Sequence, residues 1–208
     1  MRRTKVKFCG CRRESDVEDA IEAGANAVGF VLAPSPRQIT LDVLAKLAKR
    51  VPADIIPVAI FVAPTRDEMR RIEGLRDDFM LQISTHLFPR LTTGLRVIQT
   101  MQIDQAVKRS QIETVLSNLR DGTVLFDTKL GKLNGGTGRA FPWEIVAPFV
   151  SRQRSFIAGG LTAKTVGTCI RTLRPFGVDV SSGIETRGAK DSKKMRRFIA
   201  AVEQADES

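Results

Sequence analysis

The sequence has few aromatic residues: its 208 residues include eleven phenylalanines, one tryptophan and no tyrosine. Aromatic side chains supply the stacking platforms that bind single-stranded nucleic acid. A net charge of +10 is compatible with nucleic-acid binding, with an anionic substrate or simply with a basic surface. The densest basic cluster, at 193–197, lies in a helix-like stretch with intervening apolar positions, which is typical of a solvated helix face. We therefore predict no nucleic-acid partner.

Cysteine and histidine are scarce as well. The three cysteines, Cys9, Cys11 and Cys169, are odd in number, and a single residue separates the first two. This spacing argues against a disulfide framework and favours a reducing compartment. A metal site at Cys9 and Cys11 would need further ligands that the sequence does not offer, and His86 is the one histidine. We therefore predict no bound metal.

Long apolar runs are also absent. The N-terminus leads directly into a short strand-like run, and no segment approaches the length of a membrane span. We therefore expect a soluble, cytoplasmic protein with no membrane partner. Hydrophobic residues make up 42% and charged residues 27%, as in ordinary globular proteins. The length favours one domain over residues 1–208.

Short runs rich in β-branched residues alternate along the chain with helix-period segments, such as the apolar stripe formed by Leu41, Leu44 and Leu47. This alternation indicates parallel strands with crossover helices. The expected strands are 6–9, 27–31, 55–62, 79–83, 95–100, 123–127, 154–158 and 176–180. Further helices are expected near 103–120, 142–150, 162–174 and 190–204.

Several helix starts carry recognisable signals. Ser15 followed by Glu18, and Thr65 followed by Glu68, both match the capping-box spacing. Pro142 can open a helix as its first residue. These signals place boundaries on the predicted helices.

Eight strands in about two hundred residues favour an α/β fold of the closed (β/α)8-barrel kind over an open doubly wound sheet, which would need fewer strands or longer connections. The fourth β-α unit is the exception to the regular pattern. Only the segment 84–94 separates its strand from the next, and this segment contains Pro89. We therefore expect a shortened or irregular helix there.

In such barrels the active site lies at the carboxyl ends of the strands, and the loops after strands seven and eight commonly hold phosphate. The turns at these places are Ala158-Gly159-Gly160-Leu161 and Val180-Ser181-Ser182-Gly183. Small residues leave backbone N–H groups open to a phosphate. Either turn alone is compatible with an ordinary tight turn, but the two together favour phosphate binding.

Two strand ends carry groups suited to proton transfer. Cys9 shares its side of the first strand with Lys7, a cation expected to lower the thiol pKa. Asp127 ends the sixth strand after an apolar run, where partial burial would raise its pKa. Alternatively, Cys9 is an inert buried thiol, and Asp127 caps a loop or pairs with Lys129.

Three other residues require interpretation. Asp179 on the eighth strand raises the same question as Asp127, and Arg37, which follows the second strand, is a candidate clamp for a carboxylate. Cys169 shares a helical stripe with Ile170 and Leu173, so we expect it in the core. None of these residues identifies the substrate by itself.

Over nearly its whole length the chain resembles the phosphoribosylanthranilate isomerases of tryptophan biosynthesis. The resemblance is carried by short motifs along the chain. They are Val6-Lys7-Phe8-Cys9-Gly10, residues 24–30 followed by Ser35-Pro36-Arg37, Phe126-Asp127-Thr128-Lys129 followed by Gly135-Gly136-Thr137-Gly138, residues 158–161, and residues 174–185. The resemblance implies an Amadori rearrangement of N-(5-phosphoribosyl)anthranilate to 1-(2-carboxyphenylamino)-1-deoxyribulose 5-phosphate, with no cofactor and a small phosphosugar as the substrate.

The resemblance also implies a role for each candidate residue. Asp127 would donate a proton to the departing ring oxygen, and Cys9 would remove the proton from the sugar C2. Arg37 would hold the anthranilate carboxylate, and Asp179 would contact the sugar or order the site. The phosphate would be held by the two turns at Gly159, Gly160, Ser182 and Gly183. An acid with a raised pKa and a base with a lowered one suit the two halves of this reaction.

The chain departs from the family pattern at two places. Where the family reads Gln-Leu-His-Gly, this sequence has Gln82-Ile83-Ser84-Thr85, so Ser84 replaces a histidine. Gln99 occupies a position where family members often carry lysine. We expect activity with altered kinetics.

Three other functions compete with this interpretation. The related histidine-pathway isomerase is expected to have Asp at the position of Cys9, and a pentose-phosphate epimerase would need metal ligands. A third possibility is a basic nucleic-acid-binding barrel without catalysis, motivated by the +10 charge. The sequence does not indicate the oligomeric state.

Overall fold

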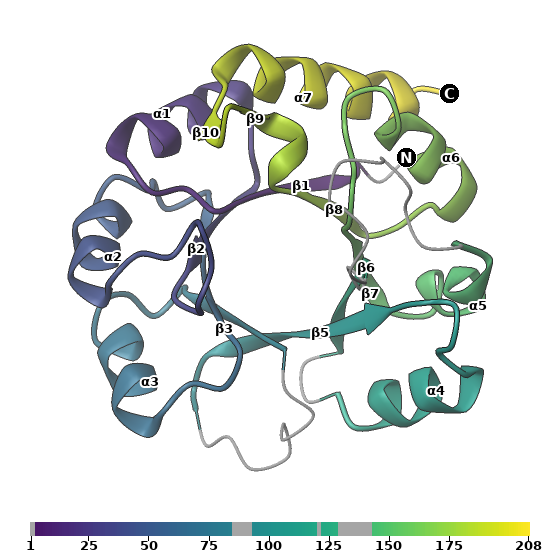
Figure 1. Cartoon of the computed structure of the whole chain (residues 1–208), viewed down its shortest axis with the longest axis horizontal. Coiled ribbons are helices and arrows are strands. Elements are labelled where there is room, and N and C mark those ends of the chain that lie inside the picture. Colours follow the sequence, from purple (N-terminus) through teal and green to yellow (C-terminus); the bar gives the residue numbers. More distant parts are fainter. Residues whose placement is uncertain (1–2, 85–92, 120–121, 129–142) are drawn as a thin grey trace.

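The computed structural model describes residues 3–84, 93–119, 122–128 and 143–208, in which eight parallel strands form a closed barrel (Figure 1). Each strand pairs with the next along the chain, and β8 pairs with β1. The predicted barrel is therefore confirmed. The strands are β1 (Lys5–Cys9), β2 (Ala27–Val31), β3 (Ile56–Phe61), β4 (Met80–Ile83), β5 (Arg96–Ile103), β6 (Thr123–Thr128), β7 (Arg154–Ile157) and β8 (Gly177–Val180).

Helices surround the barrel on its outside (Figure 1). They are α1 (Glu14–Ala23), α2 (Leu41–Ala48), α3 (Arg66–Glu73), α4 (Arg109–Ser117), α5 (Ala147–Val150), α6 (Val166–Leu173) and α7 (Ser192–Asp206). A small hairpin of β9 (Glu185–Thr186) and β10 (Ala189–Lys190) lies between β8 and α7. The irregular helix expected after β4 falls largely on residues 85–92, which lie outside the described residues.

The core has two layers because side chains alternate along each strand. In β2, Val28 and Phe30 belong to the outer layer, between the barrel and its helices. Ala27 and Val31 point the other way, into the barrel interior. The inner layer is packed with apolar side chains, and the polar groups of the site lie beyond it, toward the carboxyl ends of the strands.

Two predicted helices differ most from their expected bounds. The helix expected at 103–120 begins only at Arg109, because β5 continues pairing with β6 as far as Ile103. The helix expected at 142–150 is a 3-10 turn, Trp143–Ile145, followed by the short α5 with Pro148 in its first turn. Proline cannot donate the backbone hydrogen bond that a continuous helix would need at this point. Pro142 lies outside the described residues.

One of the two capping predictions is confirmed. Thr65 accepts a hydrogen bond from the Glu68 backbone N–H at 3.2 Å, and the Glu68 carboxylate accepts one from the Thr65 N–H at 2.7 Å. The prediction for Ser15 was wrong, because α1 already begins at Glu14. The carboxylate of Asp16 accepts from the Arg12 backbone N–H at 2.9 Å instead.

Two interpretations of side-chain environment are confirmed. The basic residues at 193–197 lie on α7, where Met195 is buried and Arg196 and Arg197 are exposed. Cys169 is fully buried on α6. Within the described part of the chain, none of the helices has the length and apolar character needed to cross a membrane.

Gly177 closes the barrel in a place where no side chain fits. A Cβ at Gly177 would lie 2.4 Å from the Phe156 ring and 2.7 Å from the Lys5 carbonyl oxygen. We expect Gly177→Ala to lower the free energy of unfolding by about 1–3 kcal/mol, the usual cost of overpacking. Urea unfolding measures this loss, and Gly94→Ala is the control because a Cβ there meets nothing within 4 Å. Equal stability of the two variants would contradict the steric explanation.

Candidate active site

The predicted acid and base both lie at the carboxyl end of the barrel. Cys9 is the last residue of β1, and Asp127 is the penultimate residue of β6. Asp127 pairs in register with Gln102 of β5, and the Gln102 amide donates a 3.3 Å hydrogen bond to its carboxylate. The charges of Lys7, Asp179 and Asp127 all act on the Cys9 thiol. The structure therefore brings these four ionisable groups into one electrostatic environment.

A buried ion pair joins the first and last strands. Lys7 and Asp179 are partners in the register of β1 and β8, and Lys7 Nζ lies 2.6 Å from Asp179 Oδ1. The Lys7 side chain is 0% exposed. Burial alone would lower the pKa of Lys7, but the charge of Asp179 outweighs it and the pKa is raised. Lys7 is therefore a permanent cation inside the barrel.

The Cys9 thiol has a raised pKa: Lys7 lowers it as predicted, but the expected net lowering was wrong. Burial is the largest cause, and it disfavours the thiolate. Lys7 and Lys190 act in the opposite direction, but Asp179, the partner of Lys7, opposes them. Cys9 is therefore a thiol at neutral pH, beside cations that stabilise its thiolate when it forms.

The Asp127 carboxyl has the raised pKa that the sequence predicts. Burial is the main cause, the negative charge of Asp179 adds to it, and together they bring the pKa to about 6. The hydrogen bond from Gln102 and the charge of Lys7 limit the rise. A carboxyl group that titrates near neutrality can donate a proton at physiological pH.

The two small-residue turns lie against each other. A Cβ at Gly183 would lie 1.9 Å from the carbonyl oxygen of Leu161, so only glycine permits this contact. A Cβ at Gly159 would lie 2.0 Å from the Thr128 hydroxyl, at the end of β6. Gly159 and Gly160 also have φ values of +86° and +67°, in the region that favours glycine.

The same turns present backbone donors. Across the ranges that the structure describes, the backbone N–H groups of Gly159, Gly160, Ser182 and Gly183 have no protein acceptor. Gly160 and Ser182 are exposed, and Gly159 and Gly183 are partly exposed. Such N–H groups can bind the oxygens of a phosphate.

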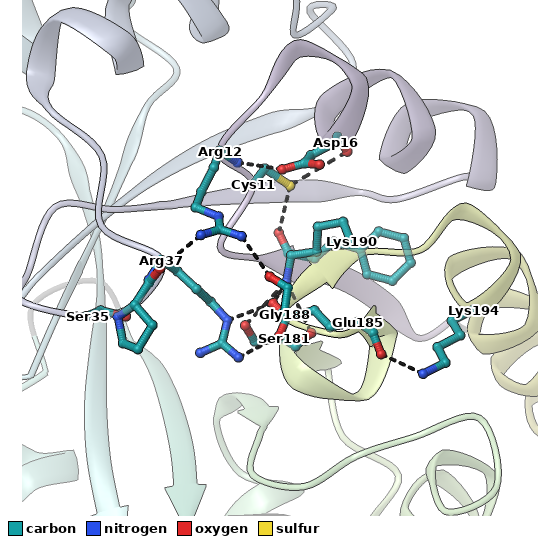
Figure 2. A network of polar contacts seen from close by, with 12 residues as sticks. Cys11, Arg12, Asp16, Ser35, Arg37, Ser181, Glu185, Gly188, Lys190 and Lys194 are labelled. Carbon is teal, nitrogen blue, oxygen red and sulfur yellow. Dashed lines mark hydrogen bonds and ion pairs between the residues drawn. The ribbon is translucent and has the colours of Figure 1, made fainter.

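Arg37 lies near Cys9, and its guanidinium already has a carboxylate partner. Nε and Nη2 donate to the two carboxylate oxygens of Glu185, each at 2.7 Å (Figure 2). Lys190 Nζ donates to the same carboxylate at 2.9 Å. A Cβ at Gly10, the residue after Cys9, would lie 2.6 Å from Arg37 Cδ. Glu185 and Lys190 are thus site residues that the sequence reasoning missed.

The barrel interior also contains two polar atoms that the sequence reasoning did not single out. Gln82 pairs in register with Ile98, and Thr100 pairs with Leu125; both partners belong to the inner layer. Gln82 Oε1 and Thr100 Oγ1 are buried and have no hydrogen-bond partner among the described residues. The alternation of polar and apolar residues in β5 was the one signal that could have indicated Thr100.

The positions that depart from the family pattern are only partly visible. Ser84 follows β4 and is half-buried, with its backbone N–H donating to the Phe61 carbonyl at 3.2 Å. Gln99 belongs to the outer side of β5 and donates to the Ile83 carbonyl at 3.3 Å, so it does not face the site. His86, Lys129 and residues 135–138 lie outside the described residues.

The site has acid-base groups but no evident set of metal ligands. The described ranges contain no group of three or more His, Cys, Asp or Glu side chains arranged to hold a metal ion. Cys9, Cys11 and Cys169 are free cysteines, and Cys11 and Cys169 are buried. What the arrangement offers is a proton donor, a thiol base, two groups of open backbone donors and an arginine.

Comparison with known proteins gives a consistent result. Residues 6–201 match a family model described as N-(5'phosphoribosyl)anthranilate (PRA) isomerase. A protein from Streptococcus pneumoniae named N-(5'-phosphoribosyl)anthranilate isomerase is 39% identical over 203 residues, which is 96% of each chain.

Solved structures agree with the sequence comparison. Phosphoribosyl anthranilate isomerase from Thermotoga maritima superposes with a TM-score of 0.82 and 28% identity, covering 97% of this chain and 99% of that one. A phosphoribosyl anthranilate isomerase in complex with reduced 1-(o-carboxyphenylamino)-1-deoxyribulose 5-phosphate has a TM-score of 0.81 and 27% identity, at the same coverage.

The raised pKa of Asp127 makes stability depend on pH. The folded-state pKa of about 6 exceeds the ordinary 3.8, so this group's contribution is fully present below pH 3.8 and is lost as the pH rises through 6. We expect Asp127→Asn to raise the free energy of unfolding at pH 8 by roughly 1–3 kcal/mol, and to change it little near pH 4.

Urea unfolding of both proteins at each pH measures this difference. Asp54→Asn, an exposed aspartate before β3, is the matched control. An Asp127→Asn variant that is less stable than the wild type at pH 8 would show that the carboxylate is not disfavoured in the fold.

Proposed function

The chain belongs to the N-(5'-phosphoribosyl)anthranilate isomerase family and catalyses that isomerisation in tryptophan biosynthesis, and we propose that Asp127 and Cys9 carry its two proton transfers. The observation that carries this proposal is the raised pKa of Asp127, about 6, at the carboxyl end of β6. A carboxyl group in that state is a proton donor that ordinary aspartates cannot match at neutral pH.

The substrate lies across the barrel mouth in this proposal. Its phosphate accepts hydrogen bonds from the backbone N–H groups of Gly159, Gly160, Ser182 and Gly183, which supports tight positioning because these donors have no other acceptor in the described ranges. Its anthranilate carboxylate meets Arg37. The ribosyl carbons then lie between the two anchors, near Cys9 and Asp127.

The first step opens the ring. Asp127 donates its proton to the ring oxygen, the bond between that oxygen and C1 breaks, and the nitrogen lone pair forms the Schiff base. The carboxylate of Asp127 that remains is held by Gln102 at 3.3 Å and lies in the field of Lys7. The fixed partners therefore stabilise the charge that develops on the acid.

The second step moves a proton from carbon to sulfur. The Cys9 thiolate removes the C2 proton, and the electron pair forms a C1–C2 double bond that neutralises the Schiff base. The resulting enol converts to the ketone of the product. Lys7 and Lys190 favour the thiolate against the burial that opposes it. Asp179 orders the site in this scheme, because it holds Lys7 at 2.6 Å.

The reaction is an internal rearrangement, since C1 is reduced as C2 is oxidised. We propose that it runs without a cofactor. We also propose that the chain acts as one barrel domain, which is supported by strands that close into a single barrel from Lys5 to Val180. Three free cysteines fit a reducing compartment such as the cytoplasm.

Steady-state turnover tests the two roles. The substrate is generated enzymatically, and its fluorescence is followed with the wild type, Cys9→Ala and Asp127→Asn. We expect turnover by the wild type and losses of about a hundredfold or more in each variant, the scale of general acid or base removal. Cys169→Ala, a buried cysteine on α6, is the control for loss of a thiol. Full activity of Asp127→Asn would refute its role as the acid.

The pKa values also predict a pH profile. The productive form has Asp127, whose pKa is about 6, protonated and Cys9, whose pKa burial raises above its ordinary value, deprotonated. We expect kcat/KM to rise up to about pH 6, to stay level and then to fall at alkaline pH. In Asp127→Asn, the residual rate should instead keep rising between pH 6 and 9, following the thiolate. A variant profile with the wild-type break at pH 6 would assign that break to another group.

A further inference from the structure

Arg37, Glu185 and Lys190 form a cluster whose inner members are almost removed from water. The side chains of Glu185 and Lys190 are 7% and 2% exposed, and that of Arg37 is 27% exposed. Burial alone would raise the pKa of Glu185, but hydrogen bonds from Arg37 and Lys190 lower this pKa to about 2. Glu185 is therefore ionised throughout the pH range in which the protein works.

Glu185 fixes the orientation of the Arg37 guanidinium. Two parallel hydrogen bonds of 2.7 Å, from Nε and Nη2, hold the planar group on one edge (Figure 2). In the described part of the structure, Arg37 Nη1 has no partner. A second carboxylate can therefore meet the guanidinium only at the edge that Nη1 and the remaining proton of Nη2 provide.

Lys190 sets the charge of the cluster. Arg37 and Glu185 alone would be neutral as a pair, and they would attract an anion weakly. Lys190 Nζ donates to Glu185 Oε1 at 2.9 Å and to the Ser181 carbonyl at 3.1 Å, so it adds a buried positive charge without contacting Arg37. The cluster then carries one net positive charge, the complement of a single carboxylate.

The surroundings hold the cluster beside the reacting groups. The Arg12 guanidinium donates to the Pro36 carbonyl at 3.0 Å and to the Gly188 carbonyl at 2.7 Å, which ties the loop of Arg37 to the β9–β10 hairpin (Figure 2). Lys194 Nζ donates to the Glu185 backbone carbonyl at 2.5 Å. The stem of Arg37 covers Gly10, the residue next to Cys9.

We propose that Glu185 and Lys190 are positioning residues for Arg37: Glu185 orients its guanidinium toward a substrate with an aromatic carboxylate, and Lys190 offsets the charge of Glu185 so that the cluster stays positive. The inference rests on the assignment of that carboxylate to Arg37 in the proposed function. In addition to the acid and the base, the site would then contain residues that determine substrate specificity. These residues, Glu185 and Lys190, are far from both Cys9 and Asp127 in the sequence.

Two stable ligands test the inference without turnover. Reductive amination of ribose 5-phosphate with anthranilate and with aniline gives a pair of phosphoribityl amines that differ only in the carboxylate. Calorimetric titration gives the ratio of their Kd values, with the wild type expected to prefer the carboxylate ligand. In the double variant Glu185→Gln/Lys190→Met, we expect this ratio to fall at least tenfold, while binding of the aniline ligand changes less than threefold.

The double variant is the main test because it removes both buried charges together and leaves the cluster with one net positive charge, so a fall in the ratio reports the lost orientation of Arg37. A single Glu185→Gln change would leave Lys190 buried without its partner carboxylate, and such a change can unfold a protein. Glu14→Gln is the matched control, since Glu14 pairs with Arg50 at the surface, where both side chains are about half exposed. It should leave the ratio unchanged.

The outcomes separate the inference from the function on which it rests. An unchanged ratio in the double variant, or an equal loss of affinity for both ligands, would overturn the positioning role. Arg37→Met should abolish the preference; if it does not, the Arg37 assignment fails, and the inference fails with it. A rise in KM with a smaller change in kcat would support the inference, and a pure loss of kcat would contradict it. Absence of turnover by the wild type would instead refute the proposed function.

Discussion

The ion pair between Lys7 and Asp179 is the interaction on which the rest of the site depends. It joins β1 to β8, where the barrel closes, and its 2.6 Å contact is buried, with Lys7 0% and Asp179 9% exposed. Buried ion pairs seldom add stability over apolar packing, so their presence calls for another explanation. Here the explanation is electrostatic. Lys7 opposes the burial that suppresses the Cys9 thiolate, whereas Asp179 raises the pKa of Asp127.

The same ion pair therefore acts on the pKa values of both the proposed acid, Asp127, and the proposed base, Cys9. Both pKa values are raised, that of Asp127 to about 6 and that of Cys9 above its ordinary value. At neutral pH a minor fraction of Asp127 is therefore protonated and able to donate, and a minor fraction of Cys9 is thiolate. A protonated Asp127 beside a Cys9 thiolate is therefore a minor protonation state of the site at neutral pH.

Local patterns in the sequence were enough to predict the barrel and to place Cys9, Asp127 and the two small-residue turns at the carboxyl ends of its strands. Each of these features depends on a strand end or on a turn, which a few neighbouring residues specify. The partner of Arg37 was not predictable in this way, because Glu185 lies 148 residues further along the chain. The direction of the Cys9 pKa was also wrong from sequence. Lys7 is visible two residues away, but burial and the competing charge of Asp179 arise only in the folded barrel.

The central claim is that the fold itself prepares Asp127 as a proton donor before any substrate binds. The most direct test is the titration of its carboxyl carbon by NMR in protein labelled at aspartate, with the signal assigned by its loss in Asp127→Asn. The account predicts a midpoint near pH 6. A midpoint near the ordinary 3.8 would contradict it, because the carboxyl would then keep no more of its proton at neutral pH than an exposed aspartate does.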